Sequence, residues 1–155
     1  MKELMSYMND HLAGAVAALE LLDHLIRKYQ GQPLEKFLVD LRDDIEADRD
    51  ELRNLVGTTR AQGSTVRKIA AWIAEKMARS KFKIAGEAMG ELGLVQALET
   101  LALGIRGKEL LWRALAASNF PATRGVDLAK LEQRAIDQQE RVEEKRLAAA
   151  CEAFR

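Results

Sequence analysis

Glu20 and His24 are the one Glu/His pair in this sequence with the spacing of metal ligands on a helix. Residues four apart lie on the same helix face, so a carboxylate and an imidazole at these positions could share a metal ion. A helical wheel places the pair more than about 100° from the apolar seam of their segment, beside polar residues. A solvated surface pair is favoured over a subunit contact or a ligand pair. His11 is the other histidine, and none follows residue 24.

Two polar residues interrupt apolar seams elsewhere in the chain. Asp48 falls between Ile45 and Leu52, and Gln138 falls between Ala135 and Val142. A buried carboxylate needs a partner. Asp48 and Gln138 are expected at the same level along their helices. We therefore expect a polar network at this level, with Arg49 and Arg106 beside it and Gln138 donating through its amide. The same comparison of levels along the helices predicts two further contacts, namely Asp23 with Lys145, and Glu109 with His11 and Arg134. The alternative is that Asp48 lies at a seam edge and is solvated.

Other catalytic chemistry finds no support in the sequence. A glycine-rich phosphate loop, a Cys-x-x-Cys motif and a plausible nucleophile triad are all missing. The single cysteine, Cys151, forms no internal disulfide, which fits a reducing compartment. Neither a signal-peptide apolar region nor a membrane-spanning run is found, so a cytoplasmic location is expected. The 24 basic residues balance the 24 acidic ones, which argues against a polycation that binds nucleic acid as a whole.

The residues above are carried by helices. The chain of 155 residues is 48% hydrophobic, rich in strong helix formers and has only two prolines, Pro33 and Pro121. Apolar residues at alternating steps of three and four predict an all-α fold. The predicted helices cover residues 2–30, 34–56, a shorter stretch from Ser64 or Thr65 to 80, a stretch after Gly86 and Gly90 to 117, and 127 to near the C-terminus.

The connections between these helices suggest their order in space. Tight links near 31–33 and 118–126 predict two antiparallel hairpins, and the segment of about 57–86 with its short helix is long enough to cross back between them. One domain over residues 1–155 is therefore expected. Two hairpins joined by one long crossover is the connectivity of a ferritin-like four-helix bundle.

Two segments strengthen that resemblance. LRDDIEADRDELRNLVG (41–57) and LVQALETLALGIRGKELLWRAL (94–115) resemble segments of small bacterial ferritin-like proteins without an intact di-iron motif. Where the family's second helix has Glu-x-x-His, this chain reads Glu46-Ala47-Asp48-Arg49, and arginine does not ligate metals. The resemblance therefore implies a non-enzymatic bundle without a cofactor, with a binding or scaffolding role and fixed charges where relatives hold metals.

The rival interpretation is a divergent metal-dependent oxidase or iron-handling protein of the same class. It would bind iron or manganese through a set of carboxylates and one histidine, namely Glu20, His24, Glu46, Glu99 and Glu140. Those carboxylates would have to turn inward. The wheel turns Glu20 outward and places Glu99 on a flank of its helix.

Charge and apolar surface point to partners. Eight acidic residues lie within 35–51, and seven basic residues lie within 60–83. The basic crossover segment is expected to contact its acidic neighbour or a second subunit, although nucleic acid or an anionic membrane is an alternative partner. Its basic residues after Arg60 are Arg67, Lys68, Lys76, Arg79, Lys81 and Lys83. An additional apolar flank at Leu92, Leu103 and Leu110 predicts a homodimer. A flank of small residues on the same segment would let another helix approach closely, either the crossover helix or a helix of a second subunit.

Overall fold

The computed structural model describes residues 2–60 and 90–155 of the chain. Within these residues, the secondary structure consists of four α-helices and one short 3-10 helix, with no strand. The prediction of an all-α protein is confirmed for this part of the chain. The described residues form two compact units, one containing α1 and α2 and the other containing α4 and α5.

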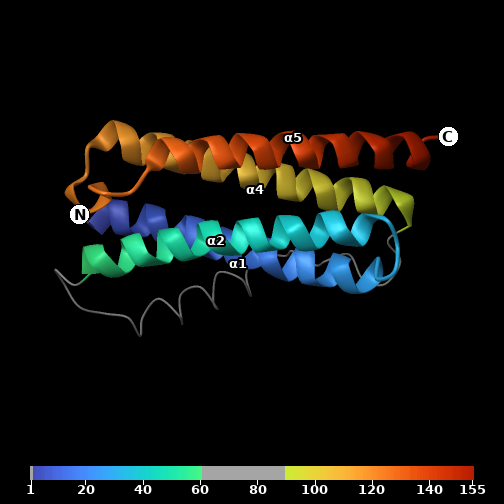
Figure 1. The fold of residues 1–155 in the computed structure, drawn as a ribbon, viewed down its shortest axis with the longest axis horizontal. Coiled ribbons are helices and arrows are strands. Elements are labelled where there is room, and N and C mark those ends of the chain that lie inside the picture. The colour runs from blue at the N-terminus through green and yellow to red at the C-terminus, as the bar shows by residue number, and fades with distance from the viewer. Residues whose placement is uncertain (1, 61–89) are drawn as a thin grey trace. The chain divides into compact units, whose positions relative to one another are not determined.

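The first unit is a hairpin of α1 (Lys2–Lys28) and α2 (Leu34–Arg60), which lie side by side (Figure 1). Gly31 makes the turn with a φ of 75°, a left-handed conformation that favours glycine. The Gly31 N–H donates to the Glu35 carboxylate at 2.7 Å, which fastens the turn to the start of α2. The turn predicted near 31–33 is therefore confirmed.

Leucine dominates the buried face of this hairpin. Leu12, Leu19 and Leu22 of α1 and Leu38 and Leu41 of α2 are all buried, as the seam spacing predicts. Burying one such side chain stabilises the fold by about 1.5–3 kcal/mol, which outweighs weak local propensities.

The predicted end of α2 at Gly57 is wrong, because the helix continues to Arg60. Leu55, Val56 and Thr59 are buried, and they hold this last turn in place. The Thr59 hydroxyl also donates to the Leu55 carbonyl at 2.7 Å. A single glycine costs a helix only about 1 kcal/mol, which these contacts offset.

The second unit is a hairpin of α4 (Glu91–Ser118) and α5 (Leu128–Ala153), joined through the 3-10 helix η1 (Pro121–Thr123). Asn119 ends α4 in the left-handed conformation, and Asp127 caps α5 by accepting from the Lys130 N–H at 3.0 Å. The end of α4 and the start of α5 lie within one residue of the predicted positions 117 and 127. Figure 1 shows the two helices side by side along most of their length.

The core of the second hairpin is built around Trp112, which is fully buried. Further buried apolar residues of the two helices are Val95, Leu98, Leu101, Ile105, Leu111, Leu115, Leu131, Ala135 and Val142. The predicted crossover helix from residue 64 or 65 to 80, and the basic residues between Arg67 and Lys83, lie outside the described residues. No helix of the described residues is long and apolar enough to cross a membrane.

Candidate functional site

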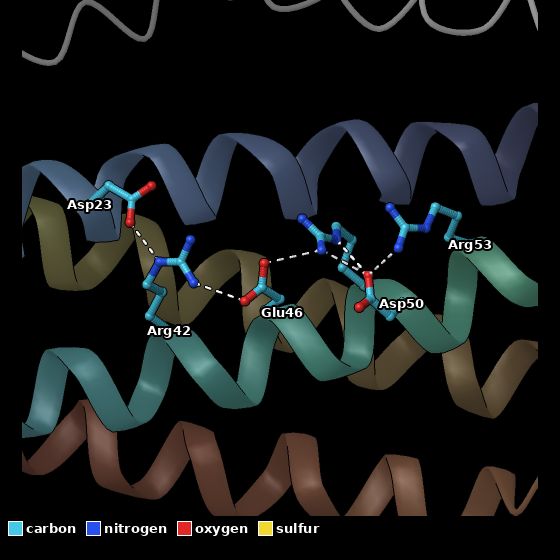
Figure 2. Close-up of polar contacts among 6 residues, drawn as sticks. Asp23, Arg42, Glu46, Asp50 and Arg53 are labelled. Carbon is cyan, nitrogen blue, oxygen red and sulfur yellow. Dashed lines mark hydrogen bonds and ion pairs between the residues drawn. The ribbon is translucent and has the colours of Figure 1, made fainter.

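A ladder of alternating charges runs along one edge of α2 and reaches across to α1 (Figure 2). We call it the charge ladder, and its members are Asp23, Arg42, Glu46, Arg49, Asp50 and Arg53. Arg42 Nε donates to Asp23 Oδ1 at 2.6 Å, which ties the two helices together. The other side of the same guanidinium donates from Nη1 to Glu46 Oε2 at 2.9 Å.

The ladder continues toward the C-terminal end of α2. Arg49 Nη2 lies 3.2 Å from Glu46 Oε1 and 2.8 Å from Asp50 Oδ1, and Arg53 Nη2 lies 2.9 Å from that same aspartate oxygen. These contacts follow the three- and four-residue spacing of helix neighbours, apart from the adjacent pair Arg49 and Asp50. Three carboxylates therefore face three guanidinium groups, and the ladder is electrically neutral.

Arg42 makes hydrogen bonds to two carboxylates of the ladder. The bonds to Asp23 and then to Glu46 raise the pKa of Arg42 above its ordinary value. Arginine is already protonated at every physiological pH, so Arg42 is a permanent cation. Glu46 is thus held between two permanent cations.

Asp48 lies on the buried face of α2, away from the half-exposed ladder. It is 1% exposed, between the buried Ile45 and Leu52. The residue takes part in a polar interaction, although its buried Oδ1 accepts no hydrogen bond from the described residues. Burial at this position fits the interruption of the seam in the sequence, whereas membership of one network with Gln138 stays a prediction.

The second unit holds its own buried carboxylate. The Glu109 side chain is 5% exposed and pairs with Arg106, one turn before it on α4, and with Arg113, one turn after it at 3.5 Å. Arg113 Nε also lies 3.5 Å from Glu132 Oε1, which connects α4 to α5. Two cations thus surround one buried anion at this point.

Gln138 is the buried polar residue of α5, with 1% of its surface exposed. Its side-chain oxygen accepts a hydrogen bond from Lys108 Nζ of α4. The Trp112 indole N–H is also buried, and it finds no hydrogen-bond acceptor among the described residues. The contact between Lys108 and Gln138 thus joins α4 to α5 near the middle of this hairpin.

The residues of the predicted metal set are scattered along the two units. Glu20 and Glu140 are exposed, and His24 is half-buried. Glu46 is held by Arg42 and Arg49, and the exposed Glu99 accepts from Arg146 Nη1 at 3.2 Å. In residues 2–60 and 90–155, no three His, Cys, Asp or Glu side chains form a group that could hold a metal ion.

The remaining residues of the predicted polar network are half-buried, except for the exposed Arg106. Asp23 pairs with Arg42, and Lys145 contacts Glu144 at 2.8 Å. His11 packs edge-on against Tyr7, with the ring centroids 4.7 Å apart, and burial lowers its pKa although Asp10 opposes this. The predicted partners Asp23 with Lys145, and Glu109 with His11 and Arg134, stay predictions.

Sequence reasoning missed the residue that joins the charge ladder to α1. Arg42 was not expected to matter, although it lies four residues before Glu46, the spacing of a helical ion pair. Its contact with Asp23 had no such signal. Arg146 was missed in the same way, since its partner Glu143 is three residues away but its partner Glu99 is on another helix.

Comparison with known proteins identifies no relative of this chain. No family model matches the sequence, and no curated protein or solved structure is similar to it. What the chain does must therefore be inferred from its own residues.

Proposed function

We propose that this chain is a ferritin-like helical bundle that works as a binding or scaffold protein in a homo-oligomer, and that it has no di-metal catalytic centre. Four helices of 26 to 28 residues, arranged as two hairpins with short links, support the bundle. The observation that carries the proposal is that two arginines occupy the Glu46 carboxylate.

Glu46 is the carboxylate that a second-helix metal site would need. Both of its oxygens are occupied by guanidinium groups, at 2.9 Å from Arg42 and 3.2 Å from Arg49. A divalent cation at this carboxylate would stand beside two permanent positive charges, which would repel it and compete with it for the carboxylate oxygens. Glu99 is paired with Arg146 in a comparable way. The arginines thus supply the charge that a metal would otherwise supply.

Metal content is the direct test. Untagged protein purified in air should contain less than stoichiometric iron or manganese, and titration with ferrous iron under oxygen should proceed at the rate of the buffer alone. Stoichiometric metal that is lost in Glu46→Gln but kept in Glu51→Gln would overturn the proposal. Glu51 is the matched control because it is an exposed glutamate of the same helix.

The oligomeric part of the proposal has a separate test. Light scattering coupled to gel filtration should give a mass near twice the 17.3 kDa of one chain, or a higher multiple. A mass of one chain at micromolar concentration would contradict self-association and leave the metal result standing.

A further inference from the structure

Three leucines on α4 are exposed although α4 is the most apolar of the helices that the structure describes. Leu92 is 52% exposed, Leu103 is 75% exposed and Leu110 is 46% exposed. At about 100° per residue the three lie within about 20° of one line along the helix. They form a stripe, here called the leucine stripe, on the face opposite to the buried Leu98 and Ile105.

Small and neutral residues complete this face. Gln96 and Ala114 are exposed and fall close to the line of the leucines, and Gly107 lies beside it. Consider a second α4 that runs antiparallel to the first, with the two-fold axis at Leu103. A residue n positions before Leu103 in one copy then faces the residue n positions after it in the other, so the numbers of facing residues add up to about 206. Leu92 then faces Ala114 and Leu110 faces Gln96, so each outer leucine meets a smaller or unbranched side chain.

The exposed charges of α4 are divided between its two ends. Before Leu103 the helix carries Glu91 and Glu99, and after it the exposed charges are Arg106 and Arg113. Glu99, Arg106 and Arg113 also lie on one flank of the leucine stripe, at about 40° to 80° from Leu103 on the helical wheel. In an antiparallel helix pair the same flanks of the two copies meet, as symmetry requires. Within one chain Glu99 pairs with Arg146, and Arg106 pairs with Glu109. The Glu99 and Arg106 side chains are still about half exposed, so Glu99 of one copy can approach Arg106 of the other.

From these features we propose that α4 pairs with α4 of a second copy of this chain, antiparallel and centred on Leu103. A parallel two-fold pair would turn the charged flanks of the two copies to opposite sides, so Glu99 would have no arginine of the other copy beside it. The antiparallel pair brings acidic half against basic half and covers the leucine stripe. This inference rests on the proposed homo-oligomer and names its surface and orientation.

The first experiment places a charge on the two-fold axis. Leu103→Glu puts two carboxylates opposite each other in apolar surroundings, so we expect the dimer to dissociate at least about 100-fold more readily. Val39→Glu is the matched control, because Val39 is an exposed apolar residue of α2. A wild-type dimer that survives Leu103→Glu, with helical content unchanged by circular dichroism, would overturn the inference and leave the homo-oligomer in place. A monomeric wild-type protein would overturn both.

The second experiment determines the relative orientation of the two α4 helices. In a Cys151→Ser background, Leu103→Cys should form a disulfide-linked dimer on oxidation, since facing residues at the axis lie within the roughly 7 Å that a disulfide spans. Leu92→Cys should not cross-link, because the two copies of residue 92 would be about 33 Å apart. Cross-linking at both positions would show a parallel pair and contradict the inference, as would cross-linking at neither.

Discussion

Water reaches the two arginine–carboxylate clusters to different extents. In the charge ladder the side chains are 20% to 63% exposed, whereas the Glu109 side chain is 5% exposed between Arg106 and Arg113. Exposed ion pairs contribute about 0–1 kcal/mol each, since solvent screens them and their side chains lose entropy. The pairs of the ladder therefore add little to the stability of the fold. Their main effects are that Arg42 links α2 to α1 through Asp23, and that Arg42 and Arg49 occupy Glu46.

The contact between Arg42 and Asp23 is the one rung of the ladder that joins two helices. We expect a double-mutant cycle with Arg42→Ala and Asp23→Ala to give a coupling energy of about 0.5–1 kcal/mol in urea unfolding. The coupling should shrink in high salt, because the pair is partly exposed. Arg53→Ala with Asp23→Ala is the control cycle, since these residues do not touch, and a coupling of the same size there would contradict the assignment.

His11 gives the protein a predictable dependence on pH. Burial lowers its folded-state pKa below 6.5, so the unfolded chain binds the proton more readily. The free energy of unfolding is therefore at its full value above about pH 6.5 and falls as the pH drops from there through the folded pKa. His11→Gln should flatten this part of the profile in chemical unfolding between about pH 7.5 and 5. A slope equal to that of the wild type would show that His11 does not carry the effect.

At the scale of helices, the sequence predicts the features that depend on neighbouring residues, such as turns and helix starts. The turn near Gly31 and Pro33 was predictable because glycine adopts a positive φ and proline starts a helix. The end of α2 was not, because burial of the residues around Gly57 outweighs the weak preference of glycine against a helix. The contact of Arg42 with Asp23 also escaped prediction, since apolar periodicity fixes which face of a helix is buried but not the relative height of two helices. Asp48 was recognised because it breaks a seam.

Two glycines of the first hairpin should respond oppositely to the same substitution. Gly14 lies within α1, is exposed and has open space where a Cβ would stand, so Gly14→Ala should stabilise the protein by about 0.5–1 kcal/mol. Gly31 also has open space, but its φ is +75°, so Gly31→Ala should destabilise by about 1 kcal/mol through backbone strain. Thermal unfolding of both variants beside the wild type measures the difference, and equal signs would contradict the turn geometry.

At the scale of the whole molecule, self-association through α4 would link stability to concentration. When a dimer unfolds to two separate chains, the folded side is favoured at high concentration by mass action. For two chains of 155 residues the unfolding entropy predicts a rise in Tm of about 2 °C for each tenfold increase in concentration. Leu103→Glu should abolish this rise, because its unfolding no longer includes dissociation, while Val39→Glu should keep it. A wild-type Tm that stays constant over a 100-fold range would mean that folding and association are not coupled, and the leucine stripe would then have to be covered by something other than a second copy.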